Sequence, residues 1–290
     1  MQQELTTMQK LNILLEVECK SKSTIKTYQS HIEKFVTYYG KEPDQKHIIG
    51  HLFYLKTKKN YDKSSLNVVR SALLYYYREV LNQEIMIKIP SQKRRKSIPK
   101  PLPKEVIKMI IDNTSNKKYQ LLFKLAYDGG FRPEEIVSLK WEDVNWWDNS
   151  IMINRGKGDK DRPSFISENV MKDLREYKEI QKKINQNYVY IFDSQQRPDY
   201  HICKRSFSEK MKEVAKKLGI EMRIYPYRLR HSFGSHMKES GEPVEDIQPR
   251  MGHSNIKTTL GYAKVAKPRE DMKSPMDDPY FNEKAVTRSS

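Results

Sequence analysis

The sequence predicts a mainly α-helical protein of two domains, with a small β-hairpin or sheet in the second domain. Three observations lead to this fold class. Apolar residues recur at helical spacing along most of the chain, one short stretch alternates apolar and polar residues, and a proline-rich basic segment divides the chain. With 290 residues, the chain is long enough for two domains that each bury a core.

The first ninety residues are expected to be helical throughout. Apolar side chains recur there every three or four positions, and Ser or Asp residues stand where helix N-caps are needed. The predicted helices are 3–19, 22–39 with Ser21 or Ser23 as its cap, 47–58, and one that follows Asp62 or Ser64.

Each of these predicted helices has one apolar face that can enter a core. Tyr75, Tyr76 and Tyr77 could stack on nucleic acid bases, but tyrosines at this spacing more often fill a core. The side chains expected to face inward are Ile25, Tyr28, Ile32, Phe35, Val36, Tyr39, Ile48, Leu52, Phe53, Leu55, Leu66, Val69, Leu73, Tyr76, Tyr77 and Val80.

Residues 91–102 are predicted to link the two domains. The stretch from Pro90 to Pro103 contains four prolines, which do not fit inside a helix, and the basic run 93–96. Such a segment could contact a DNA backbone, and a solvated spacer is the alternative.

The second domain mixes helices with one β-hairpin. Between Ser150 and Ser167, Ile151 and Ile153 alternate with polar residues and a Gly-rich turn follows, which is typical of a hairpin. The predicted helices are 103–113, 117–128, one that begins near Pro133, 167–185, 199–218, 226–239, 243–251 and about 255–264, followed by a polar tail at 269–290.

The composition favours a polyanionic partner. Lys and Arg number 54 against 37 acidic residues, a formal net charge of +17, and neutralising phosphates releases condensed counterions. Residues 1–100 hold 19 basic and 9 acidic side chains, while residues 101–290 hold 35 and 28. The denser excess at the N-terminus fits a small domain that holds backbone phosphates, and a basic surface kept for solubility is the alternative.

The composition also argues against several other classes. No apolar run approaches the roughly 20 residues that span a bilayer, and the first ten residues lack the apolar core of a secretory signal. Cys19 and Cys203 fall in different predicted domains, so a disulfide framework or a Cys-based zinc site is not expected. We therefore expect a cytoplasmic protein without a cofactor or metal.

Four motifs occur in a fixed order along the second half of the chain. They are GGFRPEEIVSLKWEDV (129–144), GKGDKDR (156–162), YPYRLRHSFGSHM (225–237) and MGHSNIKTTLGYAKV (251–265). Together they resemble the catalytic domain of the tyrosine recombinases, the phage integrase family. The resemblance spans about residues 10–266. Within the family, the chain is similar to Xer-like recombinases and to YxxR integrases of archaeal mobile elements.

The resemblance implies a domain organisation. It implies a helical, SAM-like core-binding domain at 1–90 and a catalytic domain at 103–268, which in this family form a C-shaped clamp on double-stranded DNA. It also implies a homo-oligomer, a tetramer on two DNA duplexes, with a monomer in solution considered as well. A C-terminal segment that docks on a neighbouring subunit is usual in the family.

Two arginines match the family's phosphate-binding positions, Arg132 and Arg230. Attack on a phosphodiester adds negative charge to its non-bridging oxygens, and guanidinium groups can hold these oxygens by forked hydrogen bonds. Arginine also keeps its charge at any working pH. An ion pair of Arg132 with Glu134 or Glu135 is the structural alternative.

Three further positions match the family's catalytic residues. Tyr262 is the implied nucleophile, which would form a 3′-phosphotyrosine, and His253, nine positions earlier, could donate a hydrogen bond to the phosphate. Lys157 in the Gly-rich turn could protonate the leaving 5′ oxygen, with Lys160 and Arg162 as near rivals. Because the phosphotyrosine conserves the bond energy, rejoining would need no ATP.

The chain departs from the family at one position. Tyr227 stands three residues before Arg230, where the family commonly has His. A phenol can donate a hydrogen bond to a phosphate oxygen, but it is a poor base at neutral pH. Tyr227 is therefore expected to be a phosphate ligand, and reduced activity is the other consequence considered.

The predicted function is site-specific DNA recombination through a Holliday junction. Two alternatives are considered: a type IB topoisomerase that relaxes supercoils by the same chemistry, and a DNA-binding integrase relative of weak or no activity. The departure at Tyr227 favours the last of these, whereas the complete set of Arg132, Lys157, Arg230, His253 and Tyr262 favours an enzyme.

Overall fold

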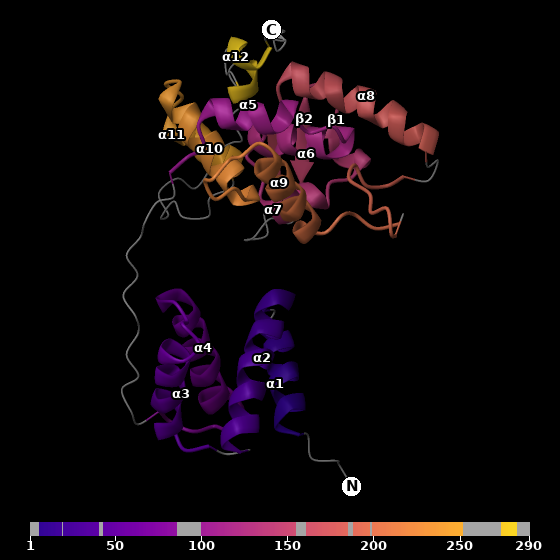
Figure 1. Ribbon diagram of the computed structural model, residues 1–290. Helices are drawn as coiled ribbons and strands as arrows, with labels where there is room; N and C mark the ends of the chain where they lie inside the picture. The colour runs from indigo at the N-terminus through magenta and orange to yellow at the C-terminus, as the bar shows by residue number, and fades with distance from the viewer. Residues whose placement is uncertain are drawn as a thin grey trace. The chain divides into compact units, whose positions relative to one another are not determined.

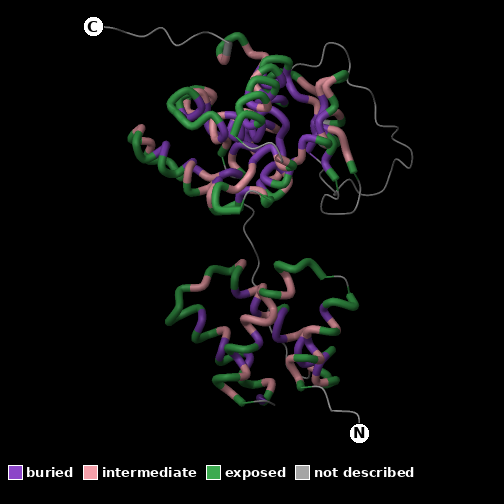
Figure 2. Tube along the Cα trace, turned by 90° about the vertical axis from the view of Figure 1, so that its right-hand side faces the viewer, coloured by how far each residue is buried: buried purple, intermediate pink, exposed green. Residues whose placement is uncertain are grey.

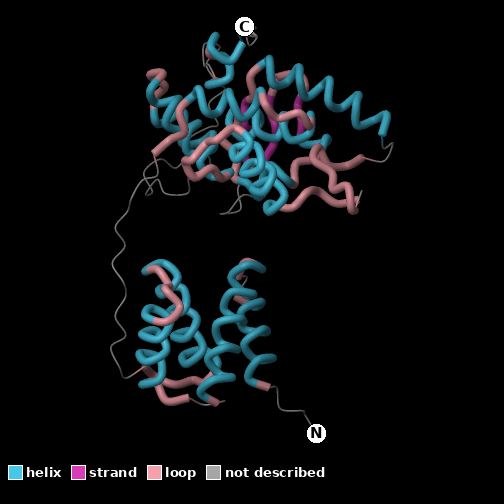
Figure 3. Tube along the Cα trace, in the orientation of Figure 1, coloured by secondary structure: helices cyan, strands magenta, loops and turns pink. Residues whose placement is uncertain are grey.

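The computed structural model shows two compact units, residues 1–97 and 98–290, which are described one at a time (Figure 1). Helices make up most of both units, and strands occur only in the second among the described residues (Figure 3). The residues that the structure describes are 6–18, 20–40, 43–85, 100–154, 161–184, 188–197, 199–251 and 274–282.

The N-terminal unit contains the four helices predicted from the sequence. Ser21 accepts a hydrogen bond from the backbone N–H of Thr24, and Asp62 accepts one from that of Ser65 at 2.7 Å, so these two residues are the N-caps. The helices are α1 (Thr7–Val17), α2 (Lys22–Tyr39), α3 (Lys46–Thr57) and α4 (Lys63–Tyr75), and α4 continues into a π-helical turn, η1 (Tyr76–Val80).

The core of this unit is aromatic as well as aliphatic. Tyr76 and Tyr77 are fully buried, which confirms that they fill a core. The Tyr77 hydroxyl donates to the backbone carbonyl of Pro43, so its polar end is satisfied. The prediction for Phe53 was wrong, since its side chain is 67% exposed. The buried stripe of α3 is instead Ile48, His51 and Leu55, and Phe53 lies on the opposite side of the helix.

The second unit contains a three-stranded antiparallel sheet, in the order β1-β2-β3. Strands β2 (Ser150–Ile153) and β3 (Arg162–Phe165) form the predicted hairpin, with Ile153 opposite Arg162 at the end next to the connecting residues. Strand β1 (Val144–Asn145) pairs with β2 and was not predicted, because two residues are too few to show an alternating pattern.

Helices surround the buried helix α6 (Lys117–Asp128) of this unit. Helix α6 contacts α5 (Lys104–Asp112), α8 (Glu168–Ile184) and α10 (Pro226–Glu239), and most of its residues are buried. The buried residues of this unit, purple in Figure 2, gather in its interior. The other elements are α7 (Pro133–Val137), the 3-10 turn η2 (Trp141–Asp143), α9 (Lys204–Lys217), α11 (Val244–Met251), the 3-10 turn η3 (Pro275–Asp277) and α12 (Pro279–Asn282).

The starts of two helices differ from the prediction. Helix α1 begins at Thr7 rather than at residue 3, because Thr6 caps it by accepting from the backbone N–H of Gln9. Helix α9 begins at Lys204 rather than near residue 199, because Cys203 caps it by accepting from the backbone N–H of Ser206. The residues before it make isolated bridges, Lys140 with Tyr190 and Asp193 with His201. The predicted helix at 255–264 lies outside the described residues.

Part of the predicted polar tail packs on the second unit. Residues 274–282 bury Met276, Lys104 pairs with Asp278 at 2.6 Å, and Ser274 hydrogen bonds to the buried carboxylate of Asp128. Among the helices of the described ranges, none combines the length and the apolar character that a bilayer crossing requires.

Asp128 makes the stability of this unit depend on pH. Burial raises the pKa of its carboxyl from 3.8 to about 6, against hydrogen bonds from Ser274 and Ser167 that lower it. The folded state therefore holds this proton more tightly than the unfolded state. Its contribution to stability is complete below pH 3.8 and is lost as the pH rises through about 6.

We predict that Asp128→Asn removes this dependence. Between pH 4 and 7 the free energy of unfolding of the wild type, relative to the variant, falls by on the order of 1–3 kcal/mol. Urea denaturation across this range measures the difference, with the exposed Asp112→Asn as the matched control. An equal fall in Asp128→Asn and wild type would contradict the assignment.

Candidate active site

Arg132 occupies the N-cap position of helix α7, two residues after Gly130. Gly130 has φ +59°, and a Cβ there would lie 2.4 Å from the Phe233 ring, so both the backbone conformation and the packing require glycine. Gly130 therefore fixes the path of the backbone from the end of α6 to Arg132. The Arg132 backbone N–H donates to Glu135 at 2.8 Å, and its Nη1 donates to the same carboxylate at 2.7 Å.

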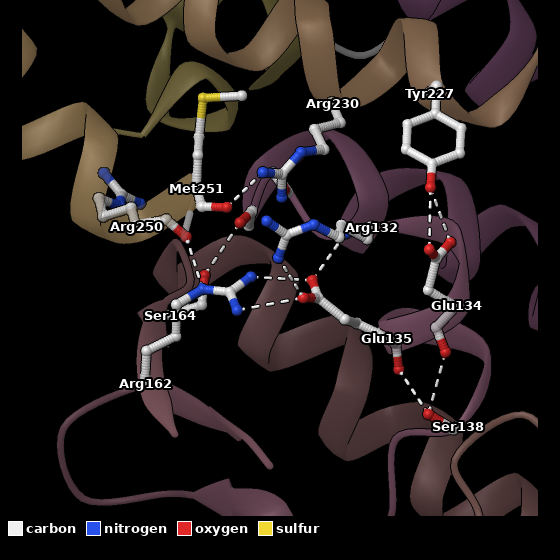
Figure 4. A network of polar contacts seen from close by, with 12 residues as sticks. Arg132, Glu134, Glu135, Ser138, Arg162, Ser164, Tyr227, Arg230, Arg250 and Met251 are labelled. Carbon is white, nitrogen blue, oxygen red and sulfur yellow. Dashed lines mark hydrogen bonds and ion pairs between the residues drawn. The ribbon is translucent and has the colours of Figure 1, made fainter. Parts of the chain in front are cut away.

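The Glu135 carboxylate is shared between two arginines (Figure 4). Besides Arg132, Arg162 at the start of strand β3 approaches it in a fork, with Nη1 at 3.1 Å and Nη2 at 2.8 Å. The Glu135 side chain is only 6% exposed. Burial alone would raise its pKa, but the hydrogen bonds from Arg162 and from the Arg132 backbone are stronger in sum and lower the pKa. The carboxylate stays ionised and joins α7 to strand β3.

Arg230 lies on α10 and is buried, with 5% of its surface exposed. Its Nη1 donates to the backbone carbonyl of Gly130 at 2.6 Å, and its Nη2 donates to that of Met251. Burial, and then the positive charge of Arg132, lower the pKa of its guanidinium to about 10. The group is still protonated at neutral pH, so the protein holds a buried cation that neighbouring cations repel.

Tyr227 lies one turn before Arg230 on the same helix. Its hydroxyl is 2.9 Å from each oxygen of the Glu134 carboxylate, to which it donates. Burial, and then the hydrogen bond to Glu134, raise its pKa to about 12, although the arginines lower it. The phenol therefore stays protonated over the whole neutral range and acts as a hydrogen-bond donor.

The structure brings three of the six predicted site residues together, Arg132, Tyr227 and Arg230. The charges of both arginines act on the Tyr227 hydroxyl, and the guanidinium groups of Arg132 and Arg230 approach the same region in Figure 4. Lys157, His253 and Tyr262 lie outside the described residues, as does Lys160. Of the three, His253 follows two positions after Met251, whose carbonyl Arg230 contacts.

Sequence reasoning missed the central role of Glu135, whose carboxylate is shared by two arginines. It considered the Arg132–Glu135 ion pair only as an alternative to phosphate binding, whereas a guanidinium has five N–H donors and can use some on each partner. Arg162 was considered a rival proton donor. It instead pairs with Glu135 and donates from Nε to the backbone carbonyl of Arg250 at 3.2 Å. Arg162 therefore connects strand β3 to helices α7 and α11.

The chemistry of this cluster suits a tetrahedral anion. Arg132, Arg162 and Arg230 repel one another's charge, and Glu135 is the carboxylate shared by two of them. The cluster therefore has a positive excess in a partly dry setting, where charge-assisted hydrogen bonds are strong. Tyr227 adds a neutral donor. An oxyanion with several oxygens, such as a phosphodiester, matches both the charge and the donors.

Comparisons with known proteins agree with this site. Residues 100–269 match the sequence model described as the Phage integrase family, and residues 8–87 match the Phage integrase, N-terminal SAM-like domain. The chain is 34% identical over 252 residues to tyrosine recombinase XerA of Pyrococcus horikoshii, covering 87% of this chain and 86% of that protein. It is 26% identical over 285 residues to tyrosine recombinase XerD of Listeria innocua, covering 89% and 93%.

Solved structures share the fold. A lambda integrase dimer bound to a COC′ core site has a TM-score of 0.67 at 17% identity, covering 89% of this chain and 98% of that chain. XerH site-specific recombinase bound to its difH substrate has a TM-score of 0.66 at 18% identity, covering 87% and 80%.

Fold and site thus define the class of integrase-like enzymes that cleave and rejoin DNA. The chain belongs to the phage integrase family, and its relatives are tyrosine recombinases. The family resemblance and the mainly helical fold with a small sheet are confirmed, and the recombinase function fits better than the topoisomerase alternative. The roles of the individual site residues remain predictions.

Proposed function

We propose that the chain is a site-specific recombinase that cuts double-stranded DNA with Tyr262 and rejoins it through a Holliday junction. The observation that carries this proposal is the pair of guanidinium groups, Arg132 and Arg230, held by fixed partners with an excess of positive charge. The proposal assigns each of the six site residues a part in one phosphoryl transfer.

The two arginines bind the scissile phosphate. Arg132 reaches the site from the N-terminus of α7, and Arg230 reaches it from α10, so the non-bridging oxygens can be held from two sides. Negative charge grows on these oxygens as the pentacoordinate state forms, and the guanidinium groups then bind more strongly than in the ground state. The bound phosphate also relieves the repulsion that lowers the pKa of Arg230.

Tyr227 takes the position of the family's histidine as a donor. Its hydroxyl is protonated at neutral pH, so it can turn from Glu134 to a phosphate oxygen without a change of protonation. The Glu134 carboxylate keeps the phenol from becoming a competing phenolate nucleophile. This arrangement supports a phosphate ligand and gives residue 227 no part as a general base.

Tyr262, Lys157 and His253 complete the reaction in this proposal. The Tyr262 phenol gives its proton to solvent water and its oxygen bonds to phosphorus, while the bond from phosphorus to the 5′ oxygen breaks. Lys157 protonates the departing 5′ oxygen, and His253 donates a hydrogen bond to the phosphate. Lys157 is favoured over Arg162 for this step because the Arg162 guanidinium is engaged with Glu135 and Arg250.

Partners follow from the relatives. Lambda integrase is a dimer bound to a core site and XerH is bound to its DNA substrate, which supports duplex DNA and further copies of this chain as partners. We assign DNA backbone binding to residues 1–90, linkage to 91–102, catalysis to 103–268 and a tail to 269–290. The working assembly is a tetramer on two duplexes in the cytoplasm.

The nucleophile assignment is tested by trapping. Incubation with a nicked suicide substrate should give wild-type chain a covalent adduct that survives SDS, since the released strand cannot return. Tyr262→Phe should lose the adduct while its affinity for the same DNA changes less than about threefold, because one hydroxyl is removed. Tyr280→Phe, a change at another C-terminal tyrosine, is the control. An adduct in Tyr262→Phe would refute the assignment.

The part of Tyr227 is tested by its pH dependence. With a pKa of about 12, the wild-type phenol should cause no inflection in the cleavage rate between pH 5.5 and 9. In Tyr227→His, an imidazole replaces it, and a new inflection should appear near pH 6.5, moved upward by the Glu134 carboxylate. The double variant Tyr227→His/Glu134→Gln should lose that upward shift. Identical profiles for wild type and Tyr227→His would remove residue 227 from the reaction.

A further inference from the structure

The N-terminal unit contains a cavity that the recombination chemistry does not use. It has a volume of about 350 Å³, lies between α2 and α3, and extends to the loop that follows α3 (helices labelled in Figure 1). This volume falls within the range of small-molecule sites, roughly 300–1,000 Å³. The cavity lies within one unit, so its geometry is independent of how the two units are placed.

Aromatic rings form most of the wall of the cavity. Six of the lining residues are aromatic, and among them Tyr39 meets His51 edge-on with ring centroids 5.8 Å apart. Tyr38 lies 4.7 Å from Tyr39 and is 77% exposed, while Tyr54 is 44% exposed. Tyr38 and Tyr54 are therefore not core residues. They hold large apolar rings in solvent beside the cavity, at a low cost in conformational entropy.

The cavity is also cationic. Lys34 and Lys59 line it, and the Lys59 ammonium lies 6.0 Å above the Tyr54 ring. No carboxylate is found among the described residues that line the cavity, and no described carboxylate pairs with either lysine. Burial, and then the charge of Lys34, lower the pKa of His31. Both lysines are exposed, so an anion that enters the cavity can reach them.

We propose that this cavity binds one unpaired nucleotide, with its base stacked on the tyrosine rings and its phosphate held by Lys34 and Lys59. A nucleotide has a flat ring, which matches the aromatic wall, and a negative charge close to that ring, which matches the two lysines. Tyrosine rings stack on any base, and lysines track the phosphate, which is the usual chemistry of single-strand binding. A paired base inside a duplex cannot present its face to such a pocket, so the ligand is unpaired.

The inference goes beyond the proposed recombination. Two sources could supply the ligand, a free mononucleotide or an unpaired nucleotide within a DNA strand, and the pocket chemistry is the same for both. An acidic protein segment would also meet the lysines, but it has no flat ring for the exposed Tyr38 and Tyr54. The contribution of the base to binding therefore separates a nucleotide from other anions.

Fluorescence anisotropy of the full-length chain with fluorescein-labelled (dT)4 tests this proposal. Unlabelled (dT)4 should compete, and a tetramer of the same charge with all four bases removed should compete at least about 10-fold less well, since base stacking on aromatic side chains is then absent. Competition by thymidine 5′-monophosphate as strong as by (dT)4 would assign the site to free mononucleotides. Much weaker competition would assign it to nucleotides within a strand.

Variants locate the binding. The pair Tyr38→Ala/Tyr54→Ala and the pair Lys34→Ala/Lys59→Ala should each weaken (dT)4 binding about 10-fold. Lys26→Ala/Lys56→Ala removes the same charge from exposed lysines outside the cavity and serves as the matched control. Circular dichroism checks that each variant is folded.

Three results would overturn the proposal: no saturable binding of (dT)4, equal competition by the base-free tetramer, or an equal loss in the control pair. Substituting iodouracil for one thymine gives a second readout, because irradiation should cross-link it to peptides of this cavity. Cross-links confined to residues 98–290 would contradict the proposal. None of these results depends on the covalent trapping that tests Tyr262.

Discussion

The shared carboxylate of Glu135 is the interaction on which the rest of the catalytic unit depends. It holds Arg132 at 2.7 Å and Arg162 at 2.8 Å, and so joins the first turn of α7 to the start of strand β3. A buried charge without a partner is costly, so one carboxylate between two guanidiniums keeps both cations in place. It does not neutralise both. The remaining positive charge can bind a phosphate.

The second half of the site comes from α10, which carries both Tyr227 and Arg230. Arg230 donates to the Gly130 carbonyl, so the glycine that positions Arg132 also anchors Arg230. Tyr227 donates a hydrogen bond to the Glu134 carboxylate, whereas Glu135 accepts from Arg132. The two acids of the Pro-Glu-Glu sequence therefore bind different partners. Glu135 holds the cations of Arg132 and Arg162 in place. Glu134 accepts the hydrogen bond of the Tyr227 phenol, which favours the protonated form of the phenol. This division of work accounts for a tyrosine at the position where the family resemblance predicts a histidine.

Sequence reasoning predicted what is local and missed what the fold brings together. Helical spacing and caps such as Ser21 placed most helices, and motif spacing selected Arg132 and Arg230. Phe53 was placed wrongly because nothing local shows that His51 is buried in its stead. The bond from Arg162 to Glu135 spans 27 positions and the bond from Tyr227 to Glu134 spans 93, so only the folded chain could reveal these partners.

We propose that Arg132 and Arg230 act by neutralising the charge of the scissile phosphate. Cleavage of a suicide substrate with one methylphosphonate at the scissile position tests it directly, since a methyl group there replaces a charged non-bridging oxygen. Arg230→Ala should lose at least about 100-fold in rate on ordinary phosphate and regain most of it on the neutral substrate. A folded Arg230→Ala chain that is equally inactive on both substrates would contradict the claim.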